Sequence, residues 1–239
     1  MLLFYIRHGD PTYKPDSLTP LGERQAQAIA KRLAYGGIDR VFSSTSNRAQ
    51  QTAKPTCEIL KKEPVLLDFA RETYVWEDFT VSGEEGRDWV NRVPKFKELF
   101  CSDEIYALGD KWYEHPKCKE YPKFKSGTLR IERATDEFLS LLGYEHDRGT
   151  HTYIITRPNE DRIALFAHQG FGWHFLSALL DIPFPLFSTH FDMSHTGMTV
   201  IYFENRESGV TVPQILTLSN DSHLFAERFP TIYDNRIKF

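Results

Sequence analysis

Cysteine is scarce in this chain of 239 residues: Cys57, Cys101 and Cys118 are the three present, and no two of them form a CxxC pair. An odd number of isolated cysteines argues against a disulfide framework and against a zinc knuckle. Such usage is typical of a reducing compartment, so we expect a cytoplasmic protein.

Long apolar runs are also missing. The first run, residues 1–6, has no basic segment ahead of it and leads directly into Arg7. A membrane span needs about 20 apolar residues, and a signal peptide needs a basic start before its apolar region. We therefore expect neither a signal peptide nor a membrane partner, and residues 1–6 are interpreted as a buried strand.

Positive charge is not in excess, because 29 Lys and Arg stand against 33 Asp and Glu, which gives a net charge of −4. A protein that binds nucleic acid through a general basic surface carries the opposite balance, so no nucleic-acid partner is expected. A local cationic pocket stays compatible with this balance, because net charge does not describe a single cleft.

What the chain does contain is an alternation of short apolar strands and amphipathic helices. Thr19 and Pro20 form a typical helix start, and Gly36-Gly37 a typical stop. The order predicts an α/β fold in which helices pack on both faces of a sheet. Strands are predicted at 1–6, 38–44, 65–67, 153–156, 163–167, 198–203 and 214–218, and helices at 20–36, 48–60, 129–142 and 171–180.

Residues 74–126 depart from this alternation: they are rich in aromatic residues, Lys and Glu, with prolines and glycines between Gly109 and Pro122. We expect a helix over 88–100 and a loop over 109–125. The aromatic side chains are expected to pack a small subcore. The whole chain is interpreted as a single domain, 1–239, with a cap inserted at about 77–128 that would act as a lid.

Polar residues follow several predicted strands. They lie in Arg7-His8-Gly9, in residues 43–49, in Arg71-Glu72 and in residues 166–170. The tripeptide alone is better explained as a surface turn. Open α/β sheets, however, bind ligands beyond the carboxyl ends of their strands, so the four segments together predict one convergent site.

These residue types suit phosphoryl transfer. Arg7 and Arg48 offer bidentate donors to phosphoryl oxygens. A neutral His8 can attack phosphorus, and His168 can donate to the equatorial oxygens. Glu72 can protonate the leaving alkoxide and then deprotonate water. The arginines and histidines supply the positive field, so no metal and no cofactor is expected.

The segments resemble the histidine phosphatase superfamily, which includes the cofactor-dependent phosphoglycerate mutases. The resemblance implies a three-layer α/β/α sandwich with a mostly parallel sheet and an inserted cap. It also implies His8 as the phosphorylated nucleophile, with Arg7, Arg48 and His168 binding the phosphoryl group and Glu72 as proton donor. The resemblance rests on residues 7–9, 16–26, 43–44, 48–53, Glu72 and 168–170.

The chain departs from this family at some positions. The mutase branch usually has a Trp-Asn pair where this chain has Tyr13-Lys14, and Lys14 either adds a cation to the pocket or is solvated. Gln169 replaces a glycine, which leaves its backbone N–H available, so Lys14 and Gln169 complete the predicted phosphate-binding set. Glu77 rivals Glu72 as the acid; we prefer Glu72 for its offset from the preceding strand.

The remaining histidines carry simpler interpretations. His174 lies among apolar residues and is expected to be a packing residue. His190 and His195 flank Asp192 but have no metal-binding spacing such as HExxH, which favours a loop with polar caps over a metal site.

Three functions fit these features. The leading hypothesis is a metal-independent phosphomonoester phosphatase that acts on a small phosphorylated metabolite. The alternatives are a cofactor-dependent phosphoglycerate mutase and a phosphate-binding module without catalysis. The sequence identifies no particular substrate, and it leaves open whether the chain forms a homodimer.

Overall fold

A six-stranded sheet forms the centre of the computed structural model, which describes residues 1–84 and 86–233. The order across the sheet is β13-β11-β1-β10-β4-β5, and β11 alone runs antiparallel to its neighbours. This confirms the predicted, mostly parallel sheet. The strands are β1 (Leu2–Arg7), β4 (Arg40–Ser44), β5 (Val65–Leu67), β10 (Arg162–Ala167), β11 (Met198–Tyr202) and β13 (Gln214–Asn220).

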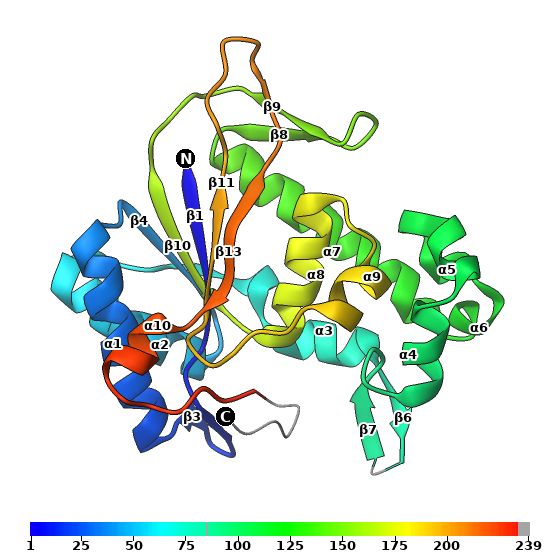
Figure 1. Ribbon diagram of the computed structural model, residues 1–239, viewed down its shortest axis with the longest axis horizontal. Coiled ribbons are helices and arrows are strands. Elements are labelled where there is room, and N and C mark those ends of the chain that lie inside the picture. The colour runs from blue at the N-terminus through cyan, green and yellow to red at the C-terminus, as the bar shows by residue number, and fades with distance from the viewer. Residues whose placement is uncertain (85, 234–239) are drawn as a thin grey trace.

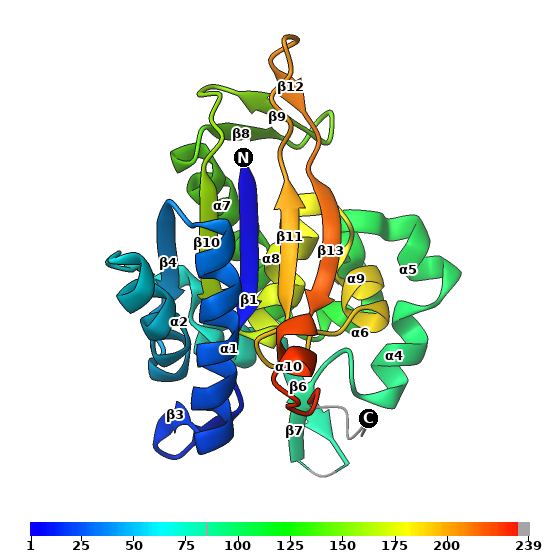
Figure 2. The same ribbon diagram turned by 60° about the vertical axis from the view of Figure 1, so that its left-hand side comes forward.

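Helices cover both faces of this sheet, which gives the predicted three layers. One face carries α1 (Pro20–Gly36), α2 (Asn47–Leu60) and α10 (Ser222–Ala226), and the other carries α7 (Pro122–Leu141) and α8 (Gln169–Leu180) (Figures 1 and 2). Strand β1 contributes side chains to the hydrophobic core on each face of the sheet, because successive side chains along a strand point to opposite faces. Leu3 and Tyr5 belong to the core under α7 and α8, whereas Phe4 and Ile6 belong to the core under α1 and α2.

The first helix begins and ends where the sequence predicts. The Thr19 side chain caps α1 by accepting the backbone N–H of Gly22, and Pro20 follows at the first helical position. Gly37 ends the helix with a φ of 75°, which glycine adopts without a Cβ penalty.

The insertion is more regular than predicted. The helix expected over 88–100 is wrong in its first half: Gly86–Trp89 forms strand β7, paired with β6 (Thr80–Gly83), and α4 starts only at Pro94. The loop expected over 109–125 is also wrong. That stretch holds a 3₁₀ helix, η2 (Gly109–Glu114), then α6 (Pro116–Lys119) and the start of α7; α4 (Pro94–Phe100) and α5 (Asp103–Leu108) precede it.

Proline position explains this difference. Pro94, Pro116 and Pro122 each occupy a first helical position, where the missing N–H has no intrahelical partner to lose. They therefore start helices instead of interrupting them. The aromatic side chains of the region do pack into the core, as expected, with Phe100 and Trp112 almost fully buried.

A second, three-stranded sheet lies apart from the first and extends to the top of Figure 1. The predicted strand at 153–156 is present as β9 (Thr152–Ile155), but it pairs with β8 (Tyr144–Asp147) and β12 (Val210–Thr211) and not with the central sheet. Further elements that the periodicity did not indicate are β2 (Pro11–Tyr13), β3 (Asp16–Leu18), η1 (Asp68–Ala70), α3 (Glu72–Phe79) and α9 (Phe184–His190).

The proposed domain limits, 1–239 with a cap at about 77–128, include residues 85 and 234–239, which lie outside the described residues. The division into domain and cap stays a prediction. Across 1–84 and 86–233, none of the helices is long and apolar enough to cross a membrane.

Candidate active site

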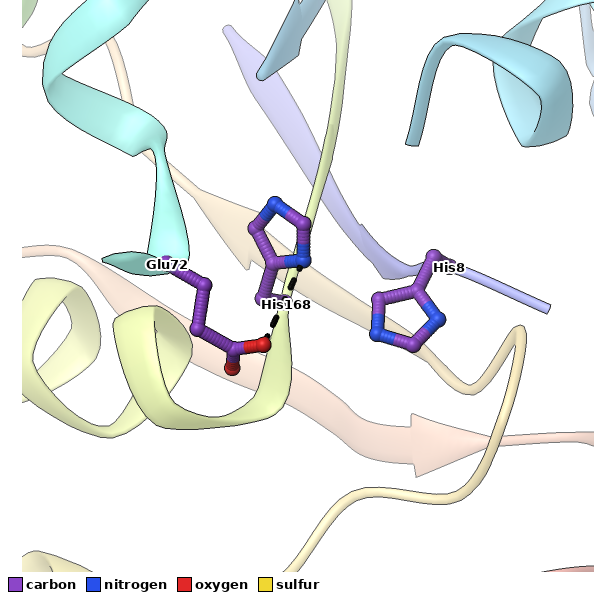
Figure 3. A group of neighbouring side chains, drawn as sticks. All are labelled: His8, Glu72 and His168. Carbon is purple, nitrogen blue, oxygen red and sulfur yellow. Dashed lines mark ion pairs between the residues drawn. The ribbon is translucent and has the colours of Figure 1, made fainter. Parts of the chain in front are cut away.

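The predicted site residues converge at the carboxyl ends of three neighbouring parallel strands. His8 follows β1, His168 follows β10 and Glu72 begins α3 (Figure 3). Arg48 lies in the first turn of α2, which follows β4. A pocket of about 530 Å³ opens there. It is lined by Arg7, His8, Tyr13, Arg48, Glu72, Thr73, Trp76, Asp88, Trp89, Arg92 and Gln169.

His8 is fixed as a neutral imidazole. Its Nδ1 lies 2.7 Å from the carbonyl oxygen of Gly9, so Nδ1 carries the proton that it donates and Nε2 carries the lone pair. Burial, with His168 and the two arginines adding to it, holds the pKa of His8 well below its usual value. An unprotonated Nε2 is the form that can act as a nucleophile.

His168 lies beside His8 and is fully buried, with 5.2 Å between the two ring centroids. Its Nε2 is 2.8 Å from the hydroxyl of Ser44, the last residue of β4, and its Nδ1 is 3.6 Å from Glu72 Oε2 (Figure 3). Burial, followed by the charges of Arg48 and Arg7, keeps the pKa of His168 well below its usual value. Strand β4 thus orients a second neutral imidazole toward the site.

Arg48 connects two carboxylates. Its Nη1 donates to Asp16 Oδ1 at 2.7 Å and its Nη2 to Glu72 Oε2 at 2.6 Å, and the arginine side chain is only 9% exposed. Glu72 Oε1 accepts the backbone N–H of Gly170 at 2.9 Å. Glu72 therefore links the starts of α2, α3 and α8.

Arg7 is buried and held by the loop that precedes β11. Its Nη1 donates to the carbonyl of Met193 at 2.6 Å, and its Nη2 lies 2.7 Å from His195 Nε2. Burial and the charge of Arg7 lower the pKa of His195 to about 2, so the neutral ring accepts this hydrogen bond.

The sequence interpretation of His195 as part of a polar loop missed its contact with Arg7. The signal was its position just before β11, because β11 pairs antiparallel with β1 and so brings this loop to the end of β1.

The other predicted residues divide into two groups. Gln169 lines the pocket, where it accepts a hydrogen bond from Arg92 and donates one to Asp192. Lys14 and Glu77 are exposed, and neither is among the described residues that line the pocket. Their roles stay predictions, as do those of the residues that the structure brings together.

Aromatic side chains form a wall of the pocket that the sequence did not indicate. Trp76 from α3 and Trp89 from β7 meet edge to face, with ring centroids 5.0 Å apart. Tyr13 from β2 lies under the Arg48 guanidinium, whose Cζ is 5.3 Å from the ring centroid. Aromatic richness was visible in the sequence, but its position beside His8 was not.

A cation could in principle use the same side chains, because ligand atoms of His8, Glu72 and His168 lie within 4.8 Å of one another. Charge argues against a divalent ion there. Arg48 already occupies Glu72 Oε2, and the second guanidinium, that of Arg7, lines the same pocket. Two fixed positive charges repel a dication and attract an anion, so the donor set fits a phosphoryl group better than a metal.

Comparison with known proteins gives a partial match to one family model and a shared fold. Residues 3–104 match the family model of the histidine phosphatase superfamily (branch 1). A phosphoserine phosphatase from Entamoeba histolytica, solved with 3-phosphoglyceric acid, superposes with a TM-score of 0.58 at 20% identity, over 93% of this chain and 98% of that one. A mycobacterial glucosyl-3-phosphoglycerate phosphatase with inorganic phosphate gives a TM-score of 0.58 at 18% identity, over the same shares of the two chains.

Curated relatives match over shorter segments. A probable phosphoglycerate mutase of Yersinia enterocolitica is 39% identical over 61 residues, which is 22% of this chain and 28% of that protein. A PE-PGRS family protein of Mycobacterium tuberculosis is 35% identical over 94 residues, 33% of this chain and 16% of that protein. The chain thus spans well under a third of either relative. In its match to this family model, its sandwich fold and its Arg7-His8-Gly9 motif at the end of β1, the chain is similar to the histidine phosphatase superfamily.

Proposed function

We propose that this protein is a phosphomonoester phosphatase that acts through a phosphohistidine on His8 and requires no metal. The observation that carries this proposal is the state of His8, a neutral ring whose Nδ1 proton is held by Gly9 and which shares its pocket with two arginines. The match of residues 3–104 to the family model of the histidine phosphatase superfamily supports the same chemistry, as do the phosphatases among the structural neighbours.

In the first step the phosphoryl group of the substrate binds between Arg7 and Arg48. Nε2 of His8 attacks phosphorus, a P–N bond forms, and the P–O bond to the alcohol breaks. His8 Nδ1 stays bonded to Gly9, which stabilises the ring as it becomes cationic. The helix dipole of α8 and the two guanidinium groups stabilise charge on the equatorial oxygens.

Glu72 supplies the proton for the leaving oxygen. In the free protein its carboxylate is paired with Arg48. A phosphomonoester dianion competes for the same guanidinium and places negative charge beside the carboxylate, which favours the protonated acid. That proton passes to the alkoxide as the P–O bond breaks.

In the second step Glu72, now a carboxylate, takes a proton from water. The water oxygen bonds to phosphorus, the P–N bond breaks, and the electron pair returns to His8 Nε2. Inorganic phosphate leaves and His8 is again a neutral ring; Glu72 gives up its proton to solvent, and its carboxylate pairs with Arg48 as in the free protein.

The test is phosphate release from p-nitrophenyl phosphate in the presence of excess chelator. We expect turnover without added metal, and a loss of at least about a thousandfold in His8→Ala, since covalent catalysis is then impossible. His151→Asn is a matched control. It changes an exposed histidine in the β8–β9 connection, far along the chain from the site, to a residue that tolerates its left-handed φ of 58°.

Two results would overturn the proposal. Isomerisation of phosphoglycerate that depends on a bisphosphoglycerate, without net phosphate release, would identify a mutase. Binding of phosphate without hydrolysis of any ester would identify a module that has lost catalysis. Activity that disappears with chelator and returns with a divalent ion would contradict the metal-independent part.

A further inference from the structure

The pocket continues well beyond the two arginines that would hold a phosphoryl group. Its volume of about 530 Å³ lies within the range of sites for drug-sized ligands, roughly 300–1,000 Å³. A phosphoryl group on a short polar chain leaves most of this space to water. The part of the pocket that the phosphoryl group does not fill is therefore the place where a larger alcohol half of the substrate would bind.

Two aromatic side chains that line this pocket are partly exposed. Tyr13 on β2 and Trp76 on α3 are 60% and 37% exposed, and both line the pocket. Other aromatic residues of the insertion, such as Trp112 and Phe124, are about 1% exposed and belong to the core. Packing thus accounts for the core aromatics, whereas part of the Trp76 side chain stays exposed at the pocket.

The aromatic wall is held in place by α8. Trp89, against which Trp76 packs edge to face, contacts Trp173 of α8 in the same manner, with centroids 5.8 Å apart. Trp89 also lies directly on Gly170, where an added Cβ would come within 2.3 Å of its ring. A wall fixed in this way binds a flat ring without having to become ordered first.

Polar side chains border the aromatic wall. Asp88 is fixed by the backbone N–H of Trp89, which donates to its Oδ1 at 2.7 Å. Arg92 donates to Gln169 at 3.0 Å and lies over the ring of Trp173 at 5.4 Å. Both line the pocket, so they present an acceptor and donors at fixed positions beside the wall. Such a pair suits a ring that carries hydrogen-bonding atoms on its edge.

We propose that the site takes phosphomonoesters whose alcohol part carries a flat heteroaromatic ring, as in a nucleoside 5′-monophosphate, and that the ring stacks on Trp76. The proposal rests on the phosphatase activity proposed above. Trp76 acts here as a specificity residue, since it contacts the ring and not the reacting atoms.

The experiment compares substrates that share one leaving group. Ribose 5-phosphate and the 5′-monophosphates of adenosine and uridine release phosphate from the same kind of oxygen and differ by the base. We expect kcat/KM to be at least tenfold higher for the nucleotides, because base–aromatic stacking is commonly of that size or larger. Trp76→Ala should remove about tenfold from the nucleotides, mainly through KM, and change ribose 5-phosphate less than twofold.

Matched variants separate stacking from general disturbance. Trp76→Phe keeps an aromatic face and should retain most of the nucleotide preference. Tyr35→Ala, which removes an aromatic side chain that is 98% exposed on α1, should change neither substrate. Equal kcat/KM for ribose 5-phosphate and the nucleotides, or equal losses for both in Trp76→Ala, would overturn the inference.

Binding to the His8→Ala variant makes the inference independent of turnover. Calorimetry should give at least tenfold tighter binding of adenosine 5′-monophosphate than of ribose 5-phosphate, and the double variant with Trp76→Ala should lose that difference. If no ester is hydrolysed by the unaltered protein but this preference is found, the phosphatase proposal fails and the ring site stands. If esters are hydrolysed and the preference is absent, the ring site fails alone.

Discussion

Glu72 has two roles that conflict in the proposed chemistry: it is the ion-pair partner of Arg48, and it must also act as the general acid. Its carboxylate accepts hydrogen bonds from Arg48 and from the backbone of Gly170, and it lies 3.6 Å from His168. In these contacts the carboxylate only accepts hydrogen bonds, whereas a general acid must donate a proton. A residue in this position can protonate an alkoxide only if the bound phosphoryl group draws Arg48 away from it.

The dependence of rate on the leaving group tests this role. In Glu72→Gln we expect kcat/KM for esters of poorly acidic alcohols to fall about a thousandfold, and for p-nitrophenyl phosphate less than tenfold, because nitrophenolate leaves without a proton. The parameter kcat/KM is the one to compare, since it reports the first phosphoryl transfer and not the later hydrolysis of phosphohistidine.

Glu77→Gln is the control for the acid, because Glu77 is exposed and lies five residues after Glu72 on α3. We expect it to leave both substrates unchanged. Equal losses for the two substrates in Glu72→Gln would show that Glu72 is not the general acid. A large loss in Glu77→Gln for esters of poorly acidic alcohols, with a small loss for p-nitrophenyl phosphate, would assign that role to Glu77.

At the scale of elements, the start of α1 is docked onto the loop that carries His8. Gly9 and Gly22 touch through their backbones: a Cβ on Gly9 would lie 2.7 Å from the carbonyl oxygen of Gly22. A Cβ on Gly22 would lie 2.2 Å from the carbonyl oxygen of Asp10. Neither obstacle is a side chain that could rotate away, so the two glycines set how closely the helix approaches the site.

Gly22→Ala should therefore weaken both stability and activity. We expect a loss of about 2 kcal/mol in the free energy of unfolding, the usual size for forced overpacking, together with a reduced kcat/KM as the His8 loop shifts. Urea unfolding and phosphate release measure the two effects. Gly149→Ala is the control, because its Cβ would meet a side-chain oxygen of Asp147 at 3.2 Å; an unchanged Gly22→Ala protein would contradict the argument.

The elements that carry the site could be predicted because their signals are local. Apolar runs that end in polar residues marked β1, β4 and β10, and parallel pairing of these neighbours is enough to bring Arg7, Ser44 and His168 to one edge. The start of α1 was visible in Thr19-Pro20 for the same reason, since a helix cap is a contact between residues close in the chain.

The elements that were missed depend on distant partners. Strand β12 has two residues, and its partner β9 lies far away in the chain: Val210 pairs with Ile154 and Thr211 with Tyr153. The contact between Arg7 and His195 spans 188 residues, and Trp76 reaches the pocket through the packing of Trp89 on Gly170. Periodicity and motif spacing contain no information on such contacts, so these parts required the structure.

At the scale of the whole molecule, the fold buries more than half of its histidines in neutral form. Of nine histidines, five have a pKa well below the usual value, in each case mainly because burial disfavours the charged ring. His174 is an example outside the site: it lies buried between Phe79 and Phe184, as its apolar neighbours in sequence had indicated. The five are His8, His168, His174, His195 and His223.

These histidines make the free energy of unfolding depend on pH. Because their pKa values are lowered in the folded state, stability falls as the pH falls. Each takes up a proton near pH 6.5 when unfolded but not when folded, so stability is complete well above pH 6.5 and is lost as the pH falls through that value. At pH 5.5 each contributes a loss of about 1 kcal/mol, and five together remove several kcal/mol from a total of roughly 5–15. His146 opposes this: burial disfavours its charge, but Asp136 and Asp181 outweigh burial and raise its pKa, so its contribution is lost as the pH rises.

Urea midpoints measured between pH 7.5 and pH 5.5 should therefore fall steeply with acid. His174→Leu should flatten that slope by about one fifth, because it removes one of the five proton sites from the unfolded chain and none from the catalytic pocket. His190→Leu is the matched control, since His190 is exposed at the end of α9 and its change should leave the slope nearly unaltered. A midpoint that does not change between these pH values, or a slope that His174→Leu leaves unaltered, would mean that burial does not keep these rings neutral.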